Sequence, residues 1–131
     1  MKPPCMIVTA HILPAVRVVV ARNLIEFHEM KPSLVASKMG LTPAAVTQYV
    51  SGVRGGMLAE DLQQSEGVKQ MVNRIVGELL KIESDTSVVT EMLCELCRIT
   101  REERLLCRFC DHSEKMRNRK DCDMCSKVSR C

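Results

Sequence analysis

The chain has 131 residues, of which 46% are hydrophobic and 2% aromatic, and its net charge is +3. With no Trp, one Tyr and two Phe, aliphatic residues and nine Met must fill the core, which favours packed helices over an aromatic-rich β-sandwich. Apolar runs such as residues 18–21 are far shorter than a membrane span, and residues 1–5 show no signal-peptide pattern. We therefore expect a cytoplasmic protein with one small domain and an appendage, and no membrane partner.

The charge is divided unevenly along the chain. Residues 1–56 carry six Lys or Arg against two Glu, residues 57–97 carry three basic against eight acidic residues, and residues 98–131 carry ten against six. A basic head, an acidic middle and a basic tail suit a protein that binds a polyanion through its ends. Ordinary solvated surfaces explain the same pattern.

Three helices are predicted in residues 1–56. Proline at the first helical position, and glycine just after the end, mark their limits, while apolar residues recur at helical spacing in the first helix. Gly40 stops the second helix and Thr42 caps the third. The predicted bounds are about 14–28, 32–39 and 43–50.

Two longer helices are predicted in the acidic middle. A wide apolar stripe from Val68 to Leu80 indicates an amphipathic helix, and Asp85 or Thr86 can cap the next one. The stripe can serve as a dimer surface or pack against the first domain. The fold expected is all-α: a DNA-binding helix-turn-helix domain of about five helices, then a small cysteine-rich tail. The predicted segments are a DNA-binding domain (1–56), a helical dimerisation segment (57–93) and a metal-binding region (94–131).

Residues 32–51, PSLVASKMGLTPAAVTQYVS, meet the requirements of a helix-turn-helix. Ala36 is small where the two helices must cross, Gly40 can take the positive φ of the turn, and Val46 supplies a β-branched core residue on the second helix. Two unrelated helices joined by a glycine turn would satisfy these spacings less often.

The segment LPAVRVVVARNLIEFHEMKPSLVASKMGLTPAAVTQYVSGVRG, residues 13–55, resembles the Cro/cI-type (XRE) helix-turn-helix. It is similar in particular to archaeal transcriptional regulators of that class, which tend to carry a Cys-x-x-Cys-bearing C-terminal region. The resemblance implies that the second helix of the motif lies in the major groove of double-stranded DNA. Pro43 departs from relatives that often have a base-reading Gln there, so DNA shape can contribute more to recognition.

The resemblance also implies which residues contact DNA. Gln48 is the best candidate for base readout, because its amide can pair bidentately with adenine. Ala44 and Ala45 offer methyl contacts, and Ser33 and Arg54 can bind phosphates. The full predicted set is Ser33, Thr42, Ala44, Ala45, Thr47, Gln48 and Arg54.

Seven of the eight cysteines fall in the last part of the chain. Cys94, Cys97, Cys107 and Cys110 form two Cys-x-x-Cys pairs with the spacing of a tetrahedral zinc site or an iron–sulfur cluster. His112 is a substitute ligand. In a reducing compartment, metal binding is a better interpretation of this pattern than a disulfide framework.

The tail adds a second possible metal site: Cys122, Cys125 and Cys131. With one upstream thiolate, their spacing resembles the ligand set of WhiB-like iron–sulfur regulators. Cys110 can belong to either set, and Cys5 is a lone thiol or a supplementary ligand. An iron–sulfur cluster, [4Fe–4S] rather than [2Fe–2S], is favoured over zinc, because a tail rich in thiolates with little core suits an exposed, redox-responsive site.

The function expected from the sequence is a homodimeric, DNA-binding transcriptional regulator whose cluster senses redox state, oxygen or iron. A regulator with purely structural zinc is the alternative. A thiol-disulfide or metal-handling protein is an alternative of another class, although no Cys-x-x-Cys pair begins a helix after a strand. A protein-binding adaptor is a further one. No phosphate loop or hydrolytic constellation is present, so we expect neither an enzyme nor a small-molecule substrate.

Overall fold

The computed structural model of the protein describes residues 4–53, 56–110 and 125. These residues form helices and turns without a strand among them, so the all-α prediction is confirmed. The chain folds in the order α1 (Pro4–Ile7), η1 (Val8–Ile12), α2 (Leu13–Glu26), α3 (Pro32–Met39), α4 (Pro43–Val50), α5 (Gly56–Leu62), α6 (Glu66–Leu79), α7 (Thr86–Glu102) and η2 (Cys107–Phe109).

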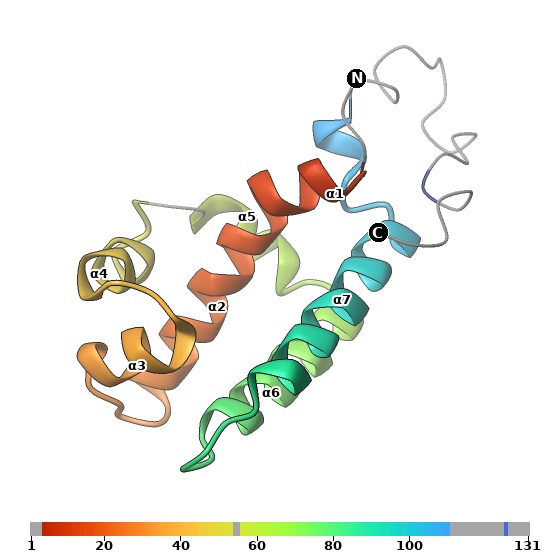
Figure 1. The fold of residues 1–131 in the computed structure, drawn as a ribbon. Coiled ribbons are helices and arrows are strands. Elements are labelled where there is room, and N and C mark those ends of the chain that lie inside the picture. Colours follow the sequence, from red (N-terminus) through yellow and green to blue (C-terminus); the bar gives the residue numbers. More distant parts are fainter. Residues whose placement is uncertain (1–3, 54–55, 111–124, 126–131) are drawn as a thin grey trace.

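The helix α2 runs through the middle of the molecule (Figure 1). Helices α3 and α4 pack on one side of it, α5 and α6 also contact it, and α7 packs on α6. Residues on most sides of α2 are buried, including Val16, Val19 and Leu24. The sides of α2 that neighbouring helices cover need apolar side chains, which accounts for its run of valines.

The α-helix α2 begins at Leu13, within one residue of the predicted start, but it continues a helical segment that the sequence did not predict, α1 and η1, from Pro4. Proline has no N–H to donate, and its ring collides with the carbonyl four residues earlier. Immediately before Pro14 the helix widens into the π-helical turn η1, where the Leu13 N–H donates to the Val8 carbonyl. A π turn of this kind accommodates the proline without ending the helix.

The joined helix Pro4–Glu26 is much longer than the apolar runs seen in the sequence. By length and composition its 23 residues could cross a membrane, since their most apolar 18-residue window has a mean hydropathy of 1.8. Half of its most apolar window is buried inside the molecule. That buried half packs against neighbouring helices as a core helix does.

The acidic middle of the chain forms a helical hairpin, α6 and α7. Ser65 begins α6, its Oγ accepting from the Val68 N–H, and Asp85 caps α7 by accepting from the Ser87 N–H at 2.8 Å. The apolar stripe predicted on α6 is buried within the chain, from Val68 to Leu79. This stripe therefore packs in the core of the chain and does not form a dimer surface.

A short helix that the sequence did not predict, α5, begins at Gly56, the second of two adjacent glycines. Ala59 and Leu62 of α5 are buried against the core. Residues 1–56 and 57–93 thus contribute to a single core.

Candidate nucleic-acid interface

Two short helices and the turn between them form a unit at one end of the molecule, which we call the α3–α4 unit (residues 32–50). Pro32 stands at the start of α3, and Pro43 at the start of α4. Between the helices, Gly40 adopts a φ of +64°, in the left-handed region that glycine enters without a steric cost. The Leu41 N–H donates to the Ala36 carbonyl at 2.8 Å, closing a Schellman-type end to α3.

The α3–α4 unit has a small core of its own against α2. Val35 and Val46 are fully buried, Ala36 and Tyr49 nearly so. Ala36 and Val46 therefore occupy the buried positions expected from the sequence. This packing fixes the angle between α3 and α4 and leaves the outer side of α4 facing solvent.

The first turn of α4 is exposed and well ordered by its own hydrogen bonds. Thr42 caps the helix, its Oγ1 accepting from the Ala45 N–H at 3.2 Å. The Thr47 hydroxyl donates to the Pro43 carbonyl at 3.1 Å. Thr42, Ala44 and Thr47 are exposed, while Ala45 and Gln48 are half-buried. Five of the residues predicted to contact DNA thus lie on one short helix and its cap.

Two further predicted contacts lie outside α4. Ser33 is exposed in the first turn of α3, next to Lys31 and Pro32, which are also exposed. Arg54 lies outside the described residues. Residues 30–53 contain two lysines and no Asp or Glu, so nothing within this segment repels a phosphate.

A residue that sequence reasoning missed, Arg22, supports the far end of α4. Its Nε donates to the Val50 carbonyl at 3.4 Å, and a cation beside the last carbonyls of a helix is favourable. Gly52 follows with a φ of +81°, and a Cβ placed there would lie 3.2 Å from the Arg22 guanidinium. Only the three-dimensional packing of α2 on α4 reveals this contact, since the two residues are far apart in sequence.

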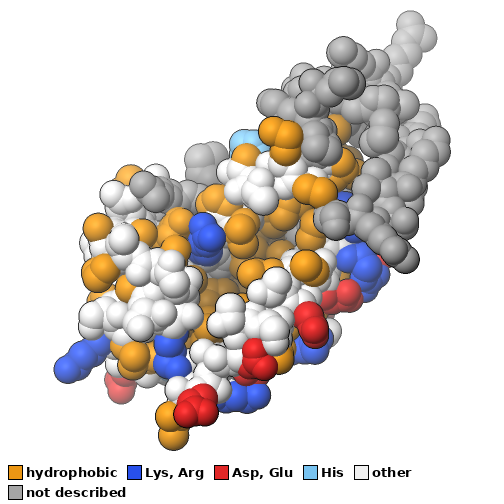
Figure 2. All heavy atoms as spheres, in the orientation of Figure 1, with side chains coloured by type: hydrophobic (Ala, Val, Ile, Leu, Met, Phe, Trp, Pro, Cys, Tyr) orange, Lys and Arg blue, Asp and Glu red, His pale blue; other side chains and the backbone are white. Residues whose placement is uncertain are grey.

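The carboxylates are concentrated elsewhere, on and around the α6–α7 hairpin (Figure 2). Hydrogen bonds from Lys81 Nζ and from the Asp85 N–H lower the pKa of Glu78, whose side chain is almost fully buried. Pairing with Arg98 lowers the pKa of Glu95, and the two groups lie on the outer surface of α7. These acids stay ionised at neutral pH, so this side of the molecule is a poor match for DNA.

The cysteines of the first predicted metal site are spread over α7 and the segment after it. Cys94 is exposed and Cys97 buried on α7, whereas Cys107 and Cys110 are half-buried at η2. In the part of the chain that the structure describes, no three His, Cys, Asp or Glu side chains are grouped closely enough to hold a metal ion. The four-thiolate site therefore stays a prediction.

The second predicted metal site lies mostly outside the described residues. Cys122, Cys131 and the substitute ligand His112 belong to that undescribed part, while Cys125 packs against the core. The segment η2 lies at the end of the molecule that holds α1 (Figure 1). The His11 and Phe109 rings stack at 4.2 Å, and Arg108 pairs with Asp61 at 2.5 Å.

Comparison of the chain with protein-family models, with curated proteins and with solved structures found no match. The resemblance to Cro/cI-type regulators therefore depends on the residues quoted for it.

Proposed function

We propose that the chain is a DNA-binding transcriptional regulator in which α3 and α4 act as a helix-turn-helix. In this proposal α4 enters the major groove with its first turn foremost, and Gln48 and Thr47 contact base edges. Ala44 offers a methyl contact, and Ala45, being half-buried, mainly helps to seat the helix. Ser33 and Lys31 contact phosphates beside the groove.

The observation that carries this proposal is the exposed, capped first turn of α4 on a unit without acidic residues. Thr42, Ala44 and Thr47 all face solvent, so this face of α4 is accessible to a DNA groove. The left-handed Gly40 and the buried Ala36 let α3 approach α4 closely enough to hold it at a fixed angle. Direct readout needs such a rigid presentation of short side chains.

The test begins with selection of preferred sequences from random duplex DNA, using the full chain under reducing conditions. Affinity is then measured by fluorescence anisotropy for the selected site and for an unrelated duplex. We expect Gln48→Ala to weaken binding to the selected site by about tenfold or more, because a bidentate base contact is worth about 1–3 kcal/mol. Lys31→Ala should weaken binding to both duplexes and reduce the salt dependence by about one counterion.

Matched controls separate loss of a contact from loss of fold. Gln70→Ala makes the same change at an exposed position of α6. Thr47→Ala is a second α4 variant that should weaken binding. Thr9→Ala is its control, since each of these exposed hydroxyls donates to a carbonyl in the preceding turn, at 3.0 and 3.1 Å. If the control variants weaken DNA binding as much as the α4 variants, or if no duplex binds, the proposal is wrong.

We further propose that two copies bind together, reading half-sites about 34 Å apart. Light scattering of the free protein and of its DNA complex measures the number of copies. Selected sites without a repeated half-site would contradict this part of the proposal.

Metal binding by the cysteines stays a prediction, and no step of the DNA-binding proposal depends on it. Anaerobic purification followed by iron, sulfide and zinc analysis tests it directly. A brown protein with iron and sulfide would support a sensing cluster, whereas a colourless protein with about one zinc per four thiolates would support a structural site.

A further inference from the structure

An apolar groove separates α2 from the α6–α7 hairpin. Both α2 and α7 pack on α6, and the groove lies between α2, the end of α3, α6 and α7. The groove encloses about 300 Å³, which is at the lower end of the range for small-molecule sites. The apolar part of its lining includes Val16, Val20, Ile75, Leu79, Val89 and Leu93. Figure 2 shows the hydrophobic atoms that gather in this hollow.

The polar groups around the groove are cations and hydroxyls. Arg17 and Lys38 line it, together with Ser37, Ser84 and Thr86, and none of the described lining residues is acidic. The half-buried Arg17 forms no side-chain hydrogen bond or ion pair with any residue that the structure describes. Lys38 Nζ donates to the Lys81 carbonyl at 2.6 Å, linking α3 to the loop after α6.

We propose that this groove binds a small anionic amphiphile: a free carboxylate with an aliphatic tail. The tail would cover the apolar floor, and the carboxylate would pair with the Arg17 guanidinium, which can grip it with two parallel hydrogen bonds. The hydroxyl groups nearby can donate further hydrogen bonds to the carboxylate oxygens. A neutral apolar ligand would leave the arginine without a counter-charge in a partly desolvated site.

The groove adjoins the α3–α4 unit, so occupancy has a consequence for it. Residues Ser37 to Gly40 at the end of α3 form one wall, and the opposite wall belongs to α7. A ligand that contacts both walls favours one placement of the α3–α4 unit against the hairpin. Ligand binding therefore changes the affinity for DNA. This regulatory consequence rests on the proposed function, whereas binding of the carboxylate does not.

The test uses decanoate below its critical micelle concentration, with the full chain and no DNA, by isothermal titration calorimetry. Decanol and decylamine, which share the tail but carry no charge or a positive charge, are the comparison ligands. We expect decanoate to bind at least tenfold more tightly than either. Arg17→Gln should abolish that preference, while Arg74→Gln, a matched change at an exposed site on α6, should keep it.

A second variant guards against an effect of Arg17 on folding. Leu93→Trp enlarges a half-buried wall residue and should block decanoate with the helical circular dichroism unchanged. The proposal would be overturned if the three ligands bound equally tightly, or if decanoate did not bind at all. It would also be overturned if Arg17→Gln and Leu93→Trp both bound decanoate as the wild type does. A dimer that seals the groove, detected by light scattering of the free protein and not dissociated by decanoate, would overturn it as well.

The regulatory step is measured separately, as DNA affinity with and without decanoate. Decanoate binding without a change in DNA affinity would refute the regulation and leave the site intact. A chain that binds decanoate but no DNA would refute the proposed function alone.

Discussion

The same chemical change at two glycines should alter stability in opposite directions. Gly40 has a φ of +64° at the turn between α3 and α4, while Gly77 lies within the helix α6. A Cβ added at either glycine meets no atom within 4 Å. New contacts therefore contribute nothing to the stability of either variant, and the backbone conformation decides whether stability rises or falls.

The magnitudes follow from the backbone alone. An alanine in the left-handed region costs about 1–2 kcal/mol, and the loss of unfolded-state freedom returns about 0.4–1 kcal/mol. Gly40→Ala should therefore destabilise the protein by about 0.8 kcal/mol at the centre of these ranges, and by at most about 1.6 kcal/mol. Gly77→Ala should stabilise it by up to about 1 kcal/mol, the difference in helix propensity.

Urea unfolding followed by far-ultraviolet circular dichroism measures both variants under reducing conditions. The slopes should match the wild type, so that midpoints compare directly. A Gly40→Ala variant as stable as the wild type, or more so, would refute the left-handed turn and with it the geometry assigned to the α3–α4 unit. The Gly77→Ala variant serves as the internal control, because its urea midpoint must rise in the same assay.

Three further variants test other parts of the structure. Hydrogen bonds lower the folded-state pKa of Glu78. Its charge therefore adds stability above the ordinary glutamate pKa of about 4.3, and this contribution is lost as pH falls through the folded pKa. Glu78→Gln should reduce the free energy of unfolding most at neutral pH, and an equal reduction at acid pH would contradict this. Arg22→Ala, which removes the donor to Val50, should cost about 0.5–1.5 kcal/mol and weaken DNA binding, whereas Arg74→Ala should do neither. Leu96→Ala, at a side chain only 2% exposed, should cost about 2–5 kcal/mol in urea unfolding, and the half-buried Leu93→Ala clearly less; equal losses would mean that α7 is turned differently on α6.

The elements predicted well are those whose signals are local. Helix α3 ends at Gly40 and α4 begins at Thr42 as the sequence predicts, because a positive φ and a capping hydroxyl each depend on one residue type. Asp85 at the start of α7 is a third example. At these positions the neighbouring residues carry all the information needed.

The features that the sequence did not reveal depend on packing. Pro14 looks like a helix start, yet the preceding π turn continues the helix through it, since apolar residues before it gain burial by remaining helical. The two adjacent glycines at the start of α5 look like a boundary, although Ala59 and Leu62 bury a helical face. Cys94 and Cys97 share a helix at a ligand spacing, but only Cys97 is on the side of α7 that the core covers.

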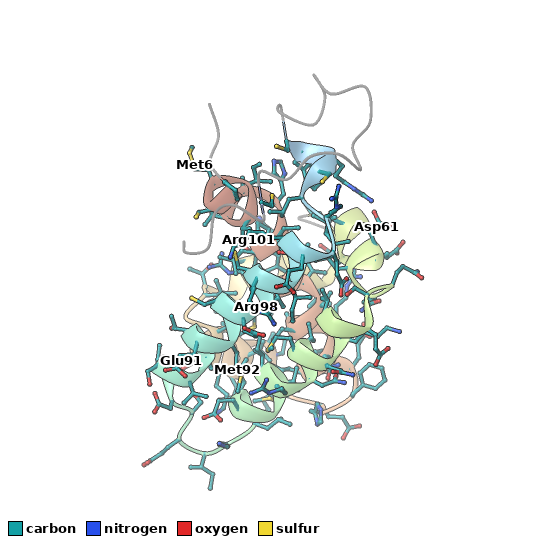
Figure 3. The ribbon with its side chains drawn as sticks, turned by 90° about the vertical axis from the view of Figure 1, so that its right-hand side faces the viewer. Met6, Asp61, Glu91, Met92, Arg98 and Arg101 are labelled. Atoms are coloured by element: carbon teal, nitrogen blue, oxygen red, sulfur yellow. The ribbon has the colours of Figure 1, made fainter. Side chains whose placement is uncertain are left out.

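The α3–α4 unit is joined to the hairpin by two separate routes. The first is α2, which contacts α3, α4 and α6. The second is the Lys38 bond to the Lys81 carbonyl, in a loop that Glu78 organises by binding both Lys81 and the Asp85 N–H. Figure 3 shows Glu91 and Met92 on the half of α7 that is nearer to this loop. The groove lies between these two connections. A ligand bound there would therefore favour one position of the α3–α4 unit without distorting α2.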